Sequence, residues 1–65
     1  MIKINGKEAM EAEGKTILEY MESHGMRKEY IAVEWNSQIL SREEYKTRLV
    51  EDGDIIEIVS FVGGG

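Results

Sequence analysis

The strongest strand pattern in the chain lies close to its end, from Ile55 to Val62. The run is rich in β-branched residues, which favour strands. Because successive side chains of a strand point to opposite faces, Ile56 and Ile58 would enter a core. The pattern predicts that Val59 and Phe61 form an apolar patch on the other face.

Shorter strand patterns precede this strand. Alternating apolar residues predict strands at residues 2–4, 7–11, 31–35 and 38–40. Asn5-Gly6 predicts a two-residue hairpin turn between the first two strands, since both positions tolerate positive φ. The composition of residues 51–54 predicts a turn before the last strand.

The main helix is predicted from Thr16 to His24. Thr16 and Glu19 have the spacing of a capping box, in which each side chain bonds to the main-chain N–H of the other residue. Gly25 is placed to close the helix in a left-handed conformation. Both ends of this helix are therefore marked in the sequence.

A second capping-box spacing occurs at Ser41 and Glu44. It predicts one helical turn at residues 42–45. The pattern of residues 45–50 is ambiguous, and Leu49 is the residue that we expect to be buried there.

The order of these elements predicts an α+β protein with the β-grasp arrangement. One main helix would pack across a mixed sheet of four to five strands. The helix provides the long crossover that a parallel pair needs, so the last strand would lie centrally, beside the first and parallel to it. Residues 1–62 would form this single domain, and residues 63–65 a flexible C-terminal glycine tail.

Three glycines, Gly63, Gly64 and Gly65, follow the last strand. Glycine has no Cβ, so the run is thin and has little preferred conformation. Extended, three residues span roughly 10 Å. Such a tail can thread a channel too narrow for side chains and present its carboxylate to another protein's active site. The alternative is a frayed chain end, which is the default for termini.

Size and charge restrict the class of protein. A chain of 65 residues forms at most one domain and has no room for a deep cleft beside its core. Without cysteine it has no disulfide, thiolate nucleophile or cysteine-based zinc site. The net charge of −5 disfavours nucleic acid and anionic membranes as partners. It fits a protein partner with a basic docking face, although solubility alone accounts for such a charge. No segment resembles a signal peptide or a membrane span, so we expect a cytoplasmic protein.

The polar residues form no recognisable catalytic or metal site. His24 is the only histidine, and its expected position at the end of the helix favours a capping or surface role. No serine has a base at recognisable spacing, and one histidine allows at most one Ser–His pair. Asp52-Gly53-Asp54 lacks the rest of a calcium loop. We therefore expect no enzyme, no bound metal and no bound cofactor.

Three stretches together resemble the ubiquitin-like sulfur carriers of the ThiS/MoaD family, and among them the carriers of the thiamine pathway. They are Asn5-Gly6, the turn Glu51-Asp52-Gly53-Asp54, and residues 56–65 with their terminal glycines. Length and element order also match, so the resemblance covers the whole chain. The small subunits of molybdopterin synthase share the turn and the Gly-Gly end. They tend to be longer and to carry prolines before the tail, whereas this chain has no proline.

The resemblance implies a sulfur carrier that is a co-substrate and not a catalyst. An E1-like adenylyltransferase (ThiF-like) would use Mg-ATP to adenylate the carboxylate of Gly65, and a persulfide donor would convert it to a thiocarboxylate. A thiazole synthase (ThiG-like) would then use the sulfur to build the thiazole of thiamine. Gly63 and Gly64 would give the tail its slim approach. Val59 and Phe61 would dock on the partner enzymes.

Other roles fit the same residues. The tail could supply sulfur for molybdopterin synthesis, or Gly65 could be joined to lysine amines, as in a ubiquitin-like protein modifier. The chain could also be an interaction domain with inert glycines. Only an inert tail tolerates deletion of Gly64 and Gly65, so this deletion separates the last role from the others.

Overall fold

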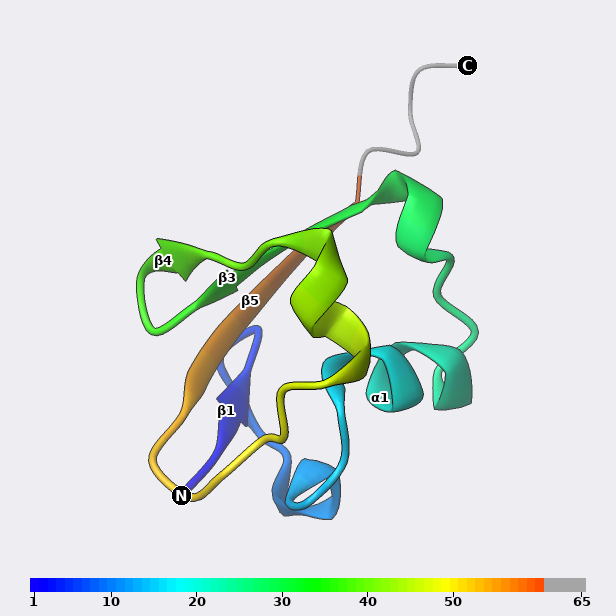
Figure 1. Cartoon of the computed structure of the whole chain (residues 1–65). Coiled ribbons are helices and arrows are strands. Elements are labelled where there is room, and N and C mark those ends of the chain that lie inside the picture. The colour runs from blue at the N-terminus through cyan, green and yellow to red at the C-terminus, as the bar shows by residue number, and fades with distance from the viewer. Residues whose placement is uncertain (61–65) are drawn as a thin grey trace.

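Figure 1 shows the computed structural model of the chain, which describes residues 1–60, with Lys28 described by its backbone alone. Its strands are β1 (Lys3–Ile4), β2 (Lys7–Glu8), β3 (Ile31–Trp35), β4 (Gln38–Ile39) and β5 (Ile55–Ser60). Its helices are the α-helix α1 (Ile17–Ser23) and the 3₁₀ helices η1 (Met10–Ala12), η2 (Lys28–Tyr30) and η3 (Arg42–Lys46).

The strand β5 is the centre of a five-stranded sheet, whose order is β2-β1-β5-β3-β4. It runs parallel to β1, where Ile4 pairs with Ile56, and antiparallel to β3. The remaining pairs of strands are antiparallel. The crossover from β1 to β5 contains α1, as a parallel pair requires. The prediction of a central last strand parallel to the first is confirmed.

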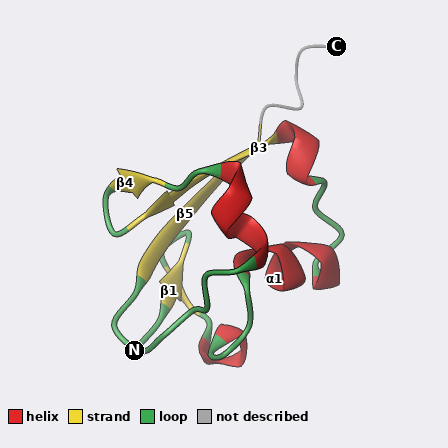
Figure 2. Ribbon diagram, in the orientation of Figure 1, coloured by secondary structure: helices red, strands yellow, loops and turns green. Residues whose placement is uncertain are grey.

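The helices gather on one side of the sheet (Figure 2), and a single hydrophobic cluster fills the space between the two layers. Its buried side chains are those of Ile2, Ile4, Ala9, Ala12, Ile17, Tyr20, Met21, Ile31, Val33, Trp35, Leu40, Tyr45, Val50 and Ile56. Apart from tyrosine and tryptophan, no polar or charged residue among those described is buried. The architecture confirms the α+β, β-grasp prediction, with five strands in the mixed sheet.

Both ends of α1 are closed by the hydrogen bonds that the sequence predicts. The hydroxyl oxygen of Thr16 accepts a bond from the N–H of Glu19 (3.1 Å), and the Glu19 carboxylate accepts one from the N–H of Thr16 (2.8 Å). At the other end Gly25 has a φ of 73°. The N–H groups of Gly25 and of the next residue donate to the carbonyl oxygens of Glu22 and Met21. This Schellman motif needs a left-handed residue, which glycine supplies without strain.

The second capping box is not formed, although residues 42–46 do make the helical turn η3. The hydroxyl of Ser41 makes no capping bond. The N–H of Glu44 donates instead to the main-chain carbonyl oxygen of Ser41 (3.0 Å). In a 3₁₀ helix each N–H bonds to the carbonyl three residues before it, so the donor that the hydroxyl would need is already used.

Replacing Thr16 by alanine is expected to lower the free energy of unfolding by about 1 kcal/mol, the usual effect of losing an N-cap side chain. A domain of 65 residues is stable by only roughly 3–10 kcal/mol, so urea denaturation resolves the loss. Ser41→Ala is the matched control, because that hydroxyl makes no capping bond. We expect its effect to stay below about 0.5 kcal/mol. Equal losses in the two variants would contradict the capping role of Thr16.

The second strand is shorter than predicted and ends at Glu8. The next residue, Ala9, turns inward, where it is buried. Its N–H donates to the carbonyl oxygen of Ile2 (2.9 Å). The chain then forms η1, in which Ala12 is also buried.

The prediction that Leu49 is buried is wrong, since half of its surface is exposed. Val50 is the fully buried residue of this segment. Its N–H donates to the carbonyl oxygen of Lys15 (2.8 Å), and its own carbonyl accepts from the N–H of Gly14 (2.9 Å). This short backbone pairing decides which of the two neighbouring side chains points inward.

Candidate functional site

The predicted docking residue Val59 lies on the face of the sheet that the helices do not cover. Along β5, Ile56 is fully buried under the helices, whereas Val59 is exposed over 51% of its surface. Val59 pairs with the partly exposed Ala32 of β3. Phe61 and residues 63–65, which complete the predicted site, lie outside the described residues. The structure thus brings Val59 and Ala32 together on this face of the sheet.

Two carboxylates stand opposite one another on the same face. Glu34 of β3 pairs with Glu57 of β5, and like charges directly opposite in a sheet are destabilising. Exposed apolar residues flank the pair: Ile39 is 74% exposed and pairs with Glu34, and Ile55 is 54% exposed. We call this surface the uncovered face and define it by Ala32, Glu34, Ile39, Ile55, Glu57 and Val59. Sequence reasoning missed the carboxylate pair, because neither strand pattern reveals the register between β3 and β5.

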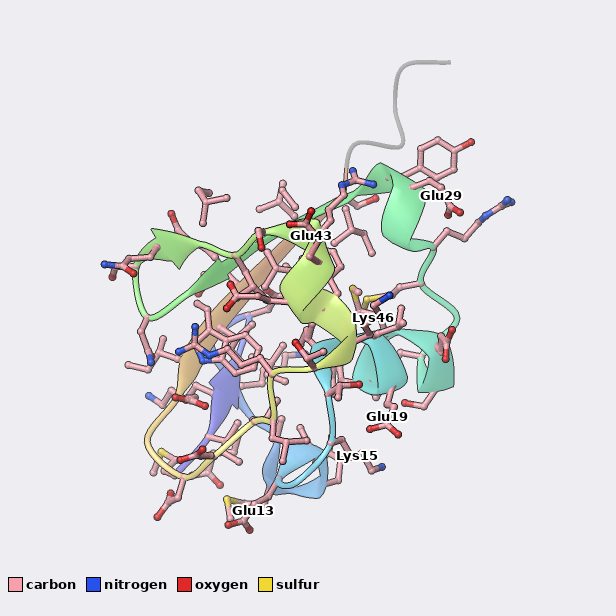
Figure 3. All side chains as sticks on the ribbon, in the orientation of Figure 1. Glu13, Lys15, Glu19, Glu29, Glu43 and Lys46 are labelled. Carbon is pink, nitrogen blue, oxygen red and sulfur yellow. The ribbon has the colours of Figure 1, made fainter. Side chains whose placement is uncertain are left out.

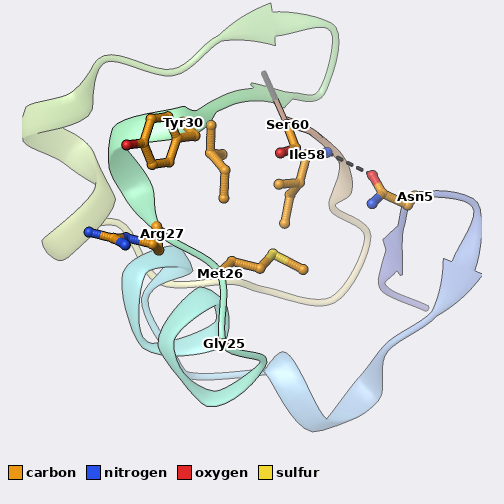
Figure 4. Close-up of a pocket in the computed structure, with 8 residues that line it drawn as sticks. Asn5, Gly25, Met26, Arg27, Tyr30, Ile58 and Ser60 are labelled. Carbon is orange, nitrogen blue, oxygen red and sulfur yellow. Dashed lines mark hydrogen bonds between the residues drawn. The ribbon is translucent and has the colours of Figure 1, made fainter. Parts of the chain in front are cut away.

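On the helix side, a groove of about 550 Å³ opens beside the end of β5 (Figure 4). The side-chain oxygen of Asn5 accepts a hydrogen bond from the N–H of Ile58 (2.7 Å) at its edge. The lining residues are Asn5, Gly25, Met26, Arg27, Tyr30, Ile31, Ile58 and Ser60. Sequence reasoning missed the groove, since its residues come from separate segments and share no local pattern.

The one histidine, His24, is the C-cap of α1, as predicted. Its ring stacks on Tyr20 with 4.1 Å between centroids, and its Nδ1 lies 3.1 Å from the hydroxyl of Ser23. That hydroxyl donates to the carbonyl oxygen of Tyr20 (2.8 Å), and within residues 1–60 no acidic side chain bonds to the ring. The Ser–His contact therefore closes a helix end and lacks the orienting group of an activated nucleophile.

Acidic side chains are spread over the surface, as the separate positions of Glu13, Glu29 and Glu43 show (Figure 3). In the described part of the chain, no group of three or more His, Asp or Glu side chains could hold a metal ion. Burial, with a smaller contribution from the charge of Glu11, raises the pKa of Tyr20. The N-terminal ammonium, which bonds to Asp52, lowers the pKa of that carboxyl. Both pKa shifts thus arise from packing or from contact with the N-terminus, and neither indicates a catalytic group.

None of the helices within residues 1–60 has the length and apolar character needed to cross a membrane.

Comparison with known proteins assigns the chain to a family. Residues 2–65 match the model of the ThiS family. The chain is 36% identical over 66 residues to the sulfur carrier protein ThiS of Bacillus subtilis. It is 35% identical over 65 residues to the protein of the same name from Thermus thermophilus. Both comparisons span the whole of each chain.

Longer proteins and solved structures give the same result. A thiazole synthase of Paramagnetospirillum magneticum is 37% identical over 62 residues, which make up 95% of this chain and 19% of that protein. The crystal structure of the thiamine biosynthesis protein ThiS from Geobacter metallireducens matches with a TM-score of 0.74 at 33% identity. That match covers 98% of this chain and 97% of the other. The chain belongs to the ThiS family.

Proposed function

We propose that this chain, a sulfur carrier protein of thiamine biosynthesis, holds its sulfur as a thiocarboxylate on Gly65. The observation that carries the proposal is the match to the ThiS family, which extends to residue 65 and includes the terminal glycines. The position of β5 supports it, because the central strand of the sheet leads directly into that segment. A carboxylate that has to enter a partner's active site benefits from neighbours without side chains.

The chemistry would come from partner enzymes, with this chain as co-substrate. A carboxylate is ionised at neutral pH and a poor electrophile, so an adenylyltransferase with Mg-ATP first forms the acyl-adenylate of Gly65 and releases pyrophosphate. The terminal sulfur of a persulfide attacks the acyl carbon and expels AMP, which leaves an acyl disulfide. A thiol then attacks the sulfur–sulfur bond, forms a new disulfide and releases the thiocarboxylate. These reactants make the cytoplasm the expected compartment.

The proposed sulfur acceptor is a thiazole synthase. Two proteins of that name, from Paramagnetospirillum magneticum and Magnetococcus marinus, contain a segment similar to this chain. The similar segment makes up 19% and 20% of them, respectively. A carrier-like segment within the polypeptide of the enzyme favours a direct association of the two. We expect this chain to associate with its own thiazole synthase in the same way.

The uncovered face is the surface with which we expect the chain to dock on these enzymes. A basic side chain of the partner would relieve the repulsion between Glu34 and Glu57. Val59 and Ile39 offer apolar contacts on either side of this pair, and Phe61 follows in the sequence. The combination fits an enzyme surface with basic residues at its centre and apolar residues on either side.

Val59→Asp is expected to weaken the binding of thiazole synthase and of adenylyltransferase by roughly tenfold or more. An unpaired charge in an interface costs more than the ~1.4 kcal/mol that corresponds to a factor of ten. Leu49→Asp is the matched control, because Leu49 is 50% exposed, Val59 is 51% exposed, and Leu49 lies outside the uncovered face. Titration calorimetry measures both affinities. Equal losses of affinity in the two variants would argue against docking through Val59.

Intact mass spectrometry tests the proposed function. The chain is incubated with the adenylyltransferase from its own cells, Mg-ATP, a persulfide donor and a thiol. We expect a mass increase equal to the exchange of one oxygen for sulfur, which fragmentation localises to Gly65. An unmodified carboxylate in the presence of active enzyme would overturn the proposal. Conjugates with lysine side chains of other proteins would point instead to a ubiquitin-like modifier.

A further inference from the structure

The hydrogen-bond ladder between β1 and β5 ends at the side chain of Asn5. The N–H of Lys3 donates to the carbonyl oxygen of Asp54 (3.1 Å), and the N–H of Asn5 donates to that of Ile56 (2.9 Å). The next main-chain donor on this side of β5 is the N–H of Ile58. It donates to the side-chain oxygen of Asn5 (2.7 Å) in place of a main-chain carbonyl oxygen of a neighbouring strand. The chain turns away at this hairpin, so β5 continues beyond its neighbour.

Beyond this point, main-chain groups of β5 face an open edge. Along a strand, the N–H and carbonyl groups of successive residues point to alternate sides. The main-chain groups of Ile55 point toward β3. The N–H of Ile55 donates to the side-chain oxygen of Asn36 (2.8 Å), and the carbonyl oxygen of Ile55 accepts from the main-chain N–H of Asn36 (2.8 Å). The carbonyl of Ile58 and the N–H of Ser60 therefore point to the other side. Among residues 1–60 no strand pairs with them there.

This open edge forms one wall of the groove in Figure 4. Met26 and Ile58 line the groove and are partly buried against the core, while Tyr30 is 46% exposed at its rim. The guanidinium of Arg27 lies 5.7 Å from the centre of the Tyr30 ring. Among the described residues, none that lines the groove is acidic, although the chain has 13 acidic residues and a net charge of −5. The part of the groove formed by residues 1–60 is thus mainly apolar, with a cation at its rim and no carboxylate side chain.

We propose that this groove binds an extended segment of the thiazole synthase that receives the tail. The segment forms strand-type hydrogen bonds with Ile58 and Ser60, places an apolar side chain in the groove and a carboxylate on Arg27. Extended peptides add to open strand edges in this way, and pockets beside the edge select their side chains. Ser60 lines the groove and directly precedes residues 61–65, so an enzyme that takes up the tail also meets the groove. The inference rests on the proposed carrier function.

Arg27→Glu tests the charge selection. Calorimetric titration with thiazole synthase is expected to show binding weakened about tenfold or more, because like charges then meet across the interface. Lys15→Glu is the matched control, because it makes the same change of charge at an exposed residue (Figure 3). Lys15 is not among the residues that line the groove. We expect the control to bind within about twofold of the wild type.

Ser60→Pro tests the hydrogen bonds to the open edge. Proline lacks the N–H, and β3 does not use this N–H, so pairing with β3 should persist and binding should fall by about tenfold. Circular dichroism and the unfolding midpoint show whether Ser60→Pro is folded; if it is not, the affinity of Arg27→Glu alone tests the proposal. A folded Ser60→Pro variant that binds thiazole synthase as tightly as the Lys15→Glu control would overturn the proposal. The intact mass of the wild-type chain reports sulfur loading separately, so failure of the carrier function is distinguished from failure of the groove.

Discussion

Replacing Gly65 by alanine is expected to slow adenylation by about 100-fold or more, while the unfolding midpoint stays unchanged. In the proposed mechanism, the added methyl group stands next to the carboxylate that would reach ATP through a narrow channel. Displacing reacting atoms by about 1 Å can cost about 100-fold in rate. The buried cluster of the described part is built from side chains within residues 2–56, so the substitution removes none of them.

The other glycines of the tail provide the control series. Gly63→Ala makes the same chemical change two residues before the carboxylate, so its adenylation should be slowed less, and Gly64→Ala should lie between the two. Pyrophosphate release by the adenylyltransferase measures all three rates. Adenylation of Gly65→Ala at the wild-type rate would contradict the narrow-channel argument, even if the carrier function itself stands.

The features that could be predicted from the sequence depend on residues close together in the chain. Asn5-Gly6 forms its turn with φ values of 54° and 81°, as the preference of such pairs for positive φ predicts. Thr16 and Glu19 cap α1 within a single turn. The alternation of β5 separates its buried from its exposed side chains. These local signals, in order, were enough to predict the sheet topology.

The features that could not be predicted depend on contacts between distant segments. Glu34 meets Glu57 only through the register of two strands, which no local pattern encodes. The choice of Val50 over Leu49 as the buried residue follows from backbone pairing with residues 14–16. The groove requires Asn5 to lie beside Ile58, more than fifty residues away in the chain. The predicted role of the tail still rests on the sequence and on the family.

The neighbouring isoleucines of β5 provide a matched test of the fold. Ile56 is fully buried and pairs with Ile4 and Trp35, whereas Ile55 is 54% exposed on the uncovered face. Ile56→Ala is expected to lower the free energy of unfolding by about 2–5 kcal/mol, because it removes buried methyl groups and leaves a cavity. Ile55→Ala should lower it by less than about 1 kcal/mol, within the range of strand propensities.

The two variants also separate stability from docking. The loss expected for Ile56→Ala is comparable with the whole stability of a domain of this size, roughly 3–10 kcal/mol. Its thiocarboxylate yield should therefore fall as the temperature rises and recover on cooling. Ile55→Ala should stay folded and affect only the affinity for the partner enzymes. Urea denaturation together with the temperature dependence of sulfur loading measures both effects. Equal destabilisation by the two substitutions would mean that β5 does not bury one face and expose the other, and the assignment of the docking surface would fail with it.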